Sequence, residues 1–183
     1  GSVEAFVDHM NQRAEELGCE GTHFANPHGY HDDNHYTTAY DITRFMKAAM
    51  EYDLFQTILT SPNYTLPANG VSEERIVRNT NALTSNYYIL SYLYGPGTGG
   101  KTGTTDEAGN CLVETAKEGD MYLISVVLGA EEVEQPDGSV DRRQFSETIK
   151  LLDWGFDNFQ RVTLTPDETL VGKVRVNLST QAD

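Results

Sequence analysis

The chain has 183 residues, of which 28 are acidic and 13 basic, and its formal net charge is −15. This negative charge speaks against nucleic acid or an anionic lipid surface as a partner. The hydrophobic content of 38% is enough for a core, and no apolar run reaches the 18 residues that would predict a membrane span. The length fits one domain with a small remnant of a second.

The first sixty residues predict three helices. Apolar residues recur at helical spacing from Phe6 to Leu17 and Gly18 follows as a stop, so we expect a helix with one buried stripe. Thr38, or Thr37 beside it, can cap a second helix that has Asp41 in its first turn. A shorter helix over residues 54–58 is expected to end before a proline at position 62. The second helix is expected to bury Ile42, Phe45, Met46 and Ala49.

Strands are predicted from residue 63 onward. Asn69-Gly70 is a hairpin signal between Tyr64-Thr65-Leu66 and Arg75-Ile76-Val77. The β-rich runs at 111–116 and 121–128 predict an antiparallel pair joined through a turn.

The last forty residues predict one helix and a new β-rich region. Asp141 caps or precedes a long amphipathic helix, and from Gln160 the apolar residues alternate as in strands. We expect only two strands there, which is marginal for an independent sheet. The helix is expected to bury Phe145, Ile149, Leu152 and Phe156.

Two incompatible chemistries can be read around Lys101. The segment Gly95-Pro96-Gly97-Thr98-Gly99-Gly100-Lys101-Thr102 satisfies the P-loop pattern, in which backbone N–H groups and the lysine hold nucleotide phosphates. The triplet Lys101-Thr102-Gly103 is also the K-T-G motif of penicillin-recognising serine enzymes.

Local structure favours the K-T-G interpretation. A P-loop lysine opens a helix, whereas Gly103, Thr104 and Thr105 are poor helix residues. Lys101 is therefore expected on a strand whose edge can accept an extended peptide. The Lys101 ammonium and the Thr102 hydroxyl would then meet an anionic group. Gly103 would let the backbone of the ligand approach closely.

Three ordered blocks of the sequence surround and include the K-T-G triplet. The blocks are Phe6-Val7-Asp8-His9-Met10-Asn11 running to Leu17-Gly18; Thr22-His23-Phe24-Ala25-Asn26-Pro27-His28-Gly29 with Tyr36-Thr37-Thr38-Ala39-Tyr40-Asp41; and Asn79-Thr80-Asn81-Ala82-Leu83 running to Lys101-Thr102-Gly103-Thr104-Thr105-Asp106-Glu107-Ala108-Gly109. With these blocks the chain resembles the D-alanyl-D-alanine carboxypeptidases, the low-molecular-weight penicillin-binding proteins of the serine peptidase class. The order and spacing of the blocks match that family from about residue 5 to about residue 158.

The resemblance implies an α/β (α+β) fold. The expected unit is a partial penicillin-binding-protein/β-lactamase-like transpeptidase domain, with an antiparallel sheet covered by helices, lacking its N-terminal strands and nucleophile helix. Residues 1–2 resemble a cloning scar, residues 3–158 the C-terminal part of the catalytic domain, and residues 159–183 the start of a β-rich C-terminal domain. An open sheet edge beside residues 121–128 predicts a homodimer or strand exchange that uses residues 162–176.

The nucleophile of the family has no counterpart in this sequence. It is the serine of an S-x-x-K motif, and no serine here has a lysine three residues later. Ser146 and Lys150 are four residues apart and are interpreted as a solvated contact on a helix. Ser61-Pro62-Asn63 spells the family's second motif, S-x-N, but it lies between the Tyr40-Asp41 helix and the block that begins at Asn79, which is not where the family has this motif. We therefore expect a C-terminal piece of the enzyme, cut just after the second motif and inactive alone.

The resemblance also implies the roles of the residues that are present. The substrate would be a peptidoglycan stem peptide ending in D-Ala-D-Ala, with β-lactam antibiotics as further ligands, outside the bacterial cytoplasm and without a metal or other cofactor. Lys101 is the one residue of the family's catalytic site that this sequence retains. Together with Thr102 it would bind the terminal carboxylate. Gly103 and Thr104 would hold the substrate backbone, and the Thr104 main chain is a candidate oxyanion donor. Some relatives have a basic residue where this sequence has Thr80, which puts in doubt whether this position contributes to binding the carboxylate.

Other interpretations stay open. A P-loop nucleotide-binding protein and a non-catalytic binding module are the alternatives to the enzyme. Residues 87–94 are interpreted as an aromatic element packed under the K-T-G strand, and Cys19 and Cys111 as free, mostly buried thiols. Imidazoles and carboxylates could form a metal site, but their spacing fits no zinc or EF-hand template. These side chains are His23, His28, His31, His35, Asp32, Asp33 and Asp41.

Overall fold

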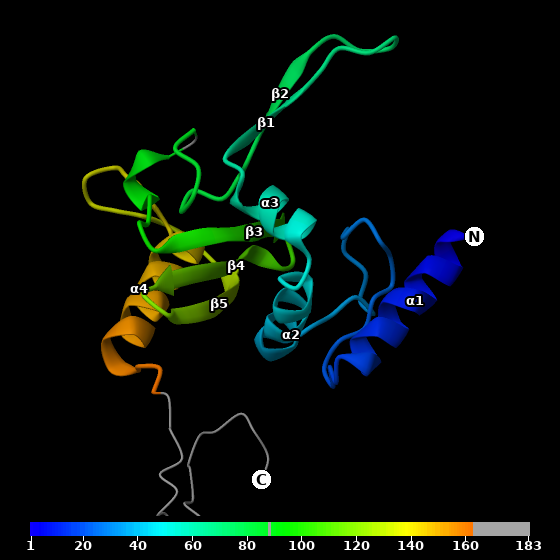
Figure 1. Ribbon diagram of the computed structural model, residues 1–183, viewed down its shortest axis with the longest axis horizontal. Helices are drawn as coiled ribbons and strands as arrows, with labels where there is room; N and C mark the ends of the chain where they lie inside the picture. The colour runs from blue at the N-terminus through cyan, green and yellow to red at the C-terminus, as the bar shows by residue number, and fades with distance from the viewer. Residues whose placement is uncertain (88, 163–183) are drawn as a thin grey trace, which may run out of the picture.

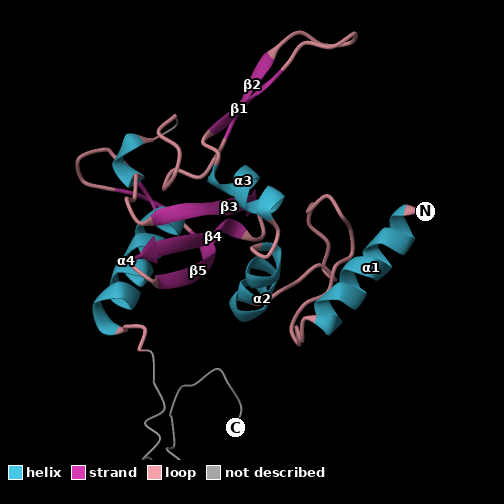
Figure 2. Ribbon diagram, in the orientation of Figure 1, coloured by secondary structure: helices cyan, strands magenta, loops and turns pink. Residues whose placement is uncertain are grey.

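The computed structural model describes residues 1–87 and 89–162. It has a mixed α/β architecture in which helices cover an antiparallel sheet (Figures 1 and 2), as predicted. The helices are α1 Val3–Glu16, α2 Ala39–Ala49, α3 Asp53–Thr60 and α4 Arg143–Asn158, with a 3-10 turn at Leu90–Tyr92. The strands are β1 Asn63–Leu66, β2 Arg75–Arg78, β3 Gly97–Thr105, β4 Gly109–Glu118, β5 Met121–Ala130, β6 Glu132–Glu134 and β7 Val140–Arg142.

The main sheet has the strand order β3-β4-β5, and both pairs are antiparallel. This confirms the predicted sheet made of the K-T-G strand and the two strands that follow it. Lys101 pairs with Val113 and Gly100 with Glu114, while Glu114 pairs on its other side with Ser125. Among the described strands, β3 and β5 are therefore the two edges of the sheet.

The predicted helix boundaries are largely confirmed. The Thr38 side chain caps α2 by accepting the N–H of Asp41, and Gly18 follows α1 with a φ of +73°, where a side chain would be strained. The predicted buried stripe of α1 is confirmed only in part: Ala14 is buried and Met10 and Leu17 are half-buried, whereas Phe6 is 58% exposed. The helix stands beside the rest of the molecule in Figure 1, and a hollow between α1, Phe24 and Phe45 of α2 lies next to it.

The core lies between α4, the sheet and the segment that leads to β3. Its buried residues are Ala82, Leu83, Leu112 and Phe145. In α4, Phe145 and Leu152 are buried as predicted, whereas Ile149 and Phe156 are only partly buried.

The aromatic segment packs against α4 and against the buried cluster that includes Leu112 of β4. The Tyr92 ring lies 5.3 Å from the Phe145 ring, and the Tyr92 hydroxyl accepts the N–H of Arg142 at 2.8 Å. The Tyr94 hydroxyl donates to Asp153 at 2.7 Å. These contacts tie the approach to β3 to α4.

Two hairpins complete the fold. The predicted β1–β2 hairpin projects away from the body in Figure 1, with Leu66 paired to Arg75. The β6–β7 hairpin was not predicted, and it places Asp141 in a strand directly before α4, so that Asp141 precedes the helix without capping it.

Three further predictions concern the chain beyond Gln160, the two cysteines and membrane-spanning helices. The strands predicted beyond Gln160 fall mostly on residues 163–183, which lie outside the described residues. Cys19 and Cys111 are free, as predicted, but half-buried. No helix in the described ranges is both long and apolar enough to cross a membrane.

Candidate functional site

The four predicted site residues lie together on the edge strand β3. Lys101, Gly103 and Thr104 are exposed and Thr102 is half-buried. Because Lys101 lies in mid-strand and does not begin a helix, the P-loop alternative is not favoured. The Lys101 ammonium donates to the Thr102 carbonyl, and the space where Gly103 lacks a side chain is open.

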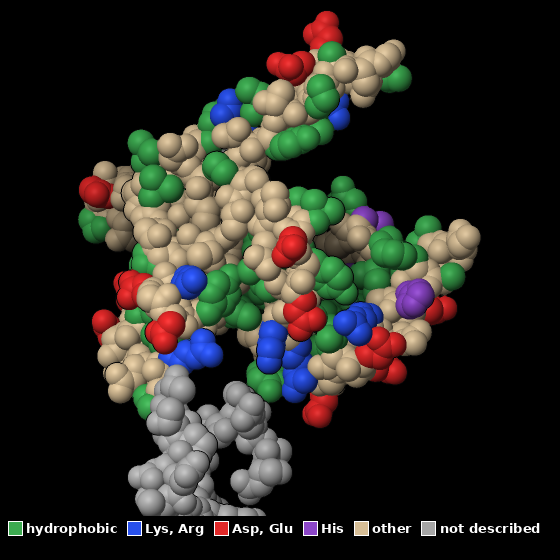
Figure 3. All heavy atoms as spheres, in the orientation of Figure 1, with side chains coloured by type: hydrophobic (Ala, Val, Ile, Leu, Met, Phe, Trp, Pro, Cys, Tyr) green, Lys and Arg blue, Asp and Glu red, His purple; other side chains and the backbone are tan. Residues whose placement is uncertain are grey.

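A groove of about 630 Å³ runs along this strand, bounded by α3 and the β1–β2 hairpin. Its described lining includes two cations, Lys101 and Arg78, and no carboxylate. Arg78 is held with its guanidinium 3.5 Å from the centre of the Tyr87 ring. In Figure 3, hydrophobic side chains also face the hollow beside the hairpin. A cationic, partly apolar groove on a chain of net charge −15 suits an anionic ligand with apolar parts.

The turn at residues 79–81 brings a second hydroxyl to the K-T-G strand. The Thr80 hydroxyl lies 2.6 Å from the Thr102 hydroxyl. The Asn79 side-chain amide donates to the carbonyls of Leu59 at 3.3 Å and Ser61 at 3.1 Å, which fixes the turn to the end of α3. Thr80 therefore lies beside the predicted carboxylate site although it carries no charge.

A buried carboxylate lies directly behind this site. Glu114 is 0% exposed; its Oε2 accepts the Asn81 side-chain amide at 2.6 Å and its Oε1 accepts the Gly99 N–H at 3.1 Å. Burial raises the pKa of Glu114 to about 7, although both hydrogen bonds act to lower it. The sequence interpretation missed Glu114, because the carboxylate is paired with residues far away along the chain.

The two serines considered as remote candidates have different surroundings. Ser61 lines the groove and its hydroxyl donates to the Thr57 carbonyl at 2.6 Å. Ser146 lies on α4, where its hydroxyl is buried without a hydrogen-bond partner, and Lys150 bonds Glu147 at 2.8 Å, so the predicted solvated Ser146–Lys150 contact is wrong.

The histidine-rich loop is held by local contacts. His23 stacks on Tyr36, and His35 Nδ1 accepts the N–H of Ala25 at 3.2 Å. Asp41 accepts the Thr22 hydroxyl at 2.7 Å, a bond that lowers the pKa of this carboxyl. Within the described ranges, no group of three or more His, Cys, Asp or Glu residues is arranged to hold a metal ion.

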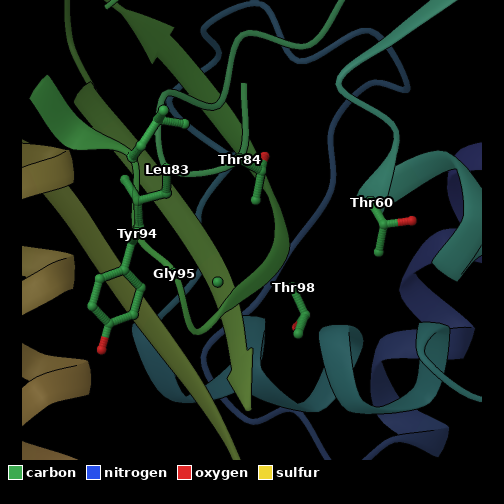
Figure 4. A pocket seen from close by; sticks show the side chains of 8 residues that line it. Thr60, Leu83, Thr84, Tyr94, Gly95 and Thr98 are labelled. Atoms are coloured by element: carbon green, nitrogen blue, oxygen red, sulfur yellow. The ribbon is translucent and has the colours of Figure 1, made fainter. Parts of the chain in front are cut away.

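A second hollow, of about 480 Å³, lies between the end of α3 and the segment that leads into β3 (Figure 4). Its lining residues include Thr60, Thr84, Tyr94 and Thr98, and none of the described ones is charged at neutral pH. This hollow offers no cation to an anionic ligand, which leaves the Lys101 groove as the candidate site.

Comparison with known proteins shows the family to which the chain is similar. The family model described as D-alanyl-D-alanine carboxypeptidase, peptidase S11, matches residues 1–132. D-alanyl-D-alanine carboxypeptidase DacF of Bacillus subtilis is 34% identical over 99% of this chain and 42% of its own length. DacC of Escherichia coli is 37% identical over 93% of this chain and 38% of its own length.

Solved structures give the same result. A D-alanyl-D-alanine carboxypeptidase from Mycobacterium tuberculosis superposes with a TM-score of 0.72 and 25% identity, covering 90% of this chain and 58% of that one. The Streptomyces K15 DD-transpeptidase gives a TM-score of 0.70 and 29% identity, covering 86% and 58%. The chain thus spans about two fifths of the curated relatives named above. With the family model matching well over half of its residues, the chain belongs to the D-alanyl-D-alanine carboxypeptidase family of peptidase S11.

Proposed function

We propose that this chain supplies the carboxylate-binding part of a serine-type D-alanyl-D-alanine carboxypeptidase. One observation carries the proposal: Lys101 and Thr102 are adjacent on an edge strand, and Lys101 lines a groove that has two cations and no carboxylate among its described lining residues. An ammonium and a hydroxyl next to each other form charge-assisted hydrogen bonds with a carboxylate. Such a contact requires a free C-terminus, which is what distinguishes the substrate of a carboxypeptidase.

The peptide would bind as an added strand along β3. Its terminal carboxylate would contact Lys101 and Thr102, with the Thr80 hydroxyl 2.6 Å from the latter. The open space beside Gly103 would admit the peptide backbone. The main chain of Thr104 would donate to the carbonyl oxygen at which negative charge develops during acyl transfer.

The chemical step would require a nucleophile that this sequence does not carry. In the family's reaction a serine of S-x-x-K attacks the bond between the last two D-alanines, D-alanine leaves, and water hydrolyses the acyl-enzyme. No serine of this chain has a lysine three residues later. The 183 residues alone would therefore act as a binding module without turnover. The substrate class, peptidoglycan stem peptides ending in D-Ala-D-Ala, and a site of action outside the cytoplasm follow from the family.

A homodimer is a further part of the proposal. Among the described strands β5 pairs only with β4, and an open sheet edge can pair with a second chain. Light scattering at high concentration should then give twice the monomer mass; a strictly monomeric species would argue against the dimer.

Two peptides test the carboxylate proposal directly. Nα,Nε-diacetyl-L-lysyl-D-alanyl-D-alanine is titrated into the chain in a calorimeter, and the same peptide with a C-terminal amide is titrated in parallel. We expect the acid to bind and the amide to bind at least tenfold more weakly, because the amide has no charge to pair with Lys101. Equal affinities, or no binding of the acid, would refute the proposal.

A further inference from the structure

The glycines before Lys101 make room for a buried carboxylate. A Cβ at Gly100 would lie 2.2 Å from Glu114 Oε2 and 2.3 Å from the Val113 carbonyl oxygen. A Cβ at Gly97 would lie 3.3 Å from Glu114 Oε1. The Glu114 side chain therefore occupies the space that side chains on β3 would otherwise fill. The run that resembles a P-loop has this packing role instead.

A β-bulge aims a backbone donor at the same carboxylate. The register of β3 against β4 shifts between Gly97 and Gly99, and Gly99 has a φ of +122°. A Cβ at Gly99 would also lie 2.7 Å from the Leu59 carbonyl oxygen. In this conformation the Gly99 N–H donates to Glu114 Oε1. The second oxygen accepts from Asn81.

The Asn81 contact continues to the face of the K-T-G strand. Asn81 belongs to a tight turn in which the Asn79 side chain accepts the Asn81 N–H at 3.0 Å, and the Asn81 side chain accepts the N–H of Leu83 at 3.1 Å. Between the two asparagines, Thr80 contacts Thr102. One buried side chain thus joins the strand that carries Lys101 to the turn that carries Thr80.

We propose that Glu114 is a positioning residue, which holds the 79–81 turn against β3 and so sets the place of the Thr80 hydroxyl beside Thr102. The positioning role of Glu114 rests on the proposed function of the K-T-G strand, whereas the coupling between Glu114 and Thr80 can be measured without any ligand. This role does not depend on the missing nucleophile, because all the residues that take part in it lie within the described ranges.

The surroundings of Glu114 contain no charged partner among the described residues. From β5, Ser125 lies opposite Glu114, and its hydroxyl is buried without a hydrogen-bond partner. From β3, the nearest ionisable residue along the strand is Lys101, whose ammonium bonds the Thr102 carbonyl and forms no ion pair with Glu114. The turn and the end of α3 present Asn81 and Leu59. The ionisation of Glu114 is therefore governed by burial and by two neutral donors.

Nuclear magnetic resonance of the ¹⁵N-labelled chain from pH 5 to pH 9 tests the coupling. We expect the Gly99 amide and the Asn81 side-chain amide to shift with a midpoint near 7, following Glu114. The amides of Thr80 and Thr102 should move with the same midpoint. Glu114→Gln should abolish all four transitions, and Glu118→Gln, at an exposed position on the same strand, should leave them unchanged.

Two results would overturn the proposal. One is a Glu114 transition that moves Gly99 and Asn81 but leaves Thr80 and Thr102 still; the other is a Thr80 and Thr102 transition that persists in Glu114→Gln. If Glu114→Gln does not fold, the carboxyl ¹³C signal of Glu114 in the unchanged chain gives the midpoint with which the Thr80 and Thr102 shifts must agree. The peptide titration is separate, so loss of peptide binding would refute the proposed function and not this coupling.

Discussion

Replacing Glu114 by glutamine should change the pH dependence of stability in a calculable way. The side chain is fully buried, and its pKa is raised from 4.5 to about 7 by burial. A carboxyl whose pKa is raised on folding binds its proton more tightly in the folded state. Its contribution to stability is therefore fully present below pH 4.5 and is lost as the pH rises through 7.

The size of the effect follows from the two pKa values. Each unit of pKa difference corresponds to about 1.4 kcal/mol, so the unchanged chain should lose about 2 to 3 kcal/mol from this group between pH 5 and pH 8. Glutamine does not titrate and shows no such loss. Its amide N–H₂ group must face one of the two donors, Asn81 or Gly99, which adds a constant destabilisation. This constant does not vary with pH and cancels from the comparison.

Urea unfolding of both proteins at pH 5, 6, 7 and 8 measures the effect. The difference in unfolding free energy, unchanged chain minus Glu114→Gln, should fall by about 2 to 3 kcal/mol across this range. Glu118→Gln, at an exposed position of the same strand, is the control and should give a difference that is flat with pH. A flat difference for Glu114→Gln would show that Glu114 is ionised in the folded chain throughout the range, and would refute the argument from burial.

Four further predictions follow from the site. Lys101→Met should weaken binding of the acid peptide by about 1.5 to 3 kcal/mol in calorimetry, because it removes a hydrogen bond to a charged group; unchanged affinity would exclude Lys101 as the carboxylate partner. Thr80→Val should weaken it by about 0.5 to 1.5 kcal/mol if the Thr80 hydroxyl helps to hold Thr102, and an unaltered binding constant would dismiss that help. Gly100→Ala should lower the free energy of unfolding by about 1 to 3 kcal/mol through overlap with Val113 and Glu114, whereas Gly103→Ala, where the space is open, should not; equal effects would contradict the packing argument. Benzylpenicillin should leave no covalent adduct on the chain in intact-mass spectrometry, and a stoichiometric adduct on any serine would show that a nucleophile has been overlooked.

Much of the strand architecture could be predicted from local sequence. The β-branched Thr104 and Thr105 and the glycines around them excluded a helix after Lys101, and the structure places that lysine in β3. Alternation and turn residues likewise predicted the β1–β2 and β4–β5 hairpins. These features depend on neighbours within a few residues, which is the range over which sequence patterns are informative.

Features that depend on distant contacts could not be predicted. Asn81 and Glu114 are separated by 33 positions, so no local pattern links this pair. The same holds for Phe6, because periodicity identifies the apolar side of a helix and does not say whether another element covers it. The glycines at positions 97, 99 and 100 form part of a match to the P-loop pattern, and that pattern describes a phosphate-binding loop. Only the fold shows that these glycines accommodate Glu114.

In the proposed function, the K-T-G strand binds the C-terminal carboxylate of a D-Ala-D-Ala peptide. Mapping the diacetyl-lysyl-D-alanyl-D-alanine site on the ¹⁵N-labelled chain by nuclear magnetic resonance tests it most directly. We predict that the largest shifts fall on Lys101, Thr102, Gly103 and Thr104, with a smaller shift at Thr80, and that the C-terminal amide of the same peptide produces none of them. Shifts confined to another surface, or equal shifts with the acid and the amide, would contradict the claim.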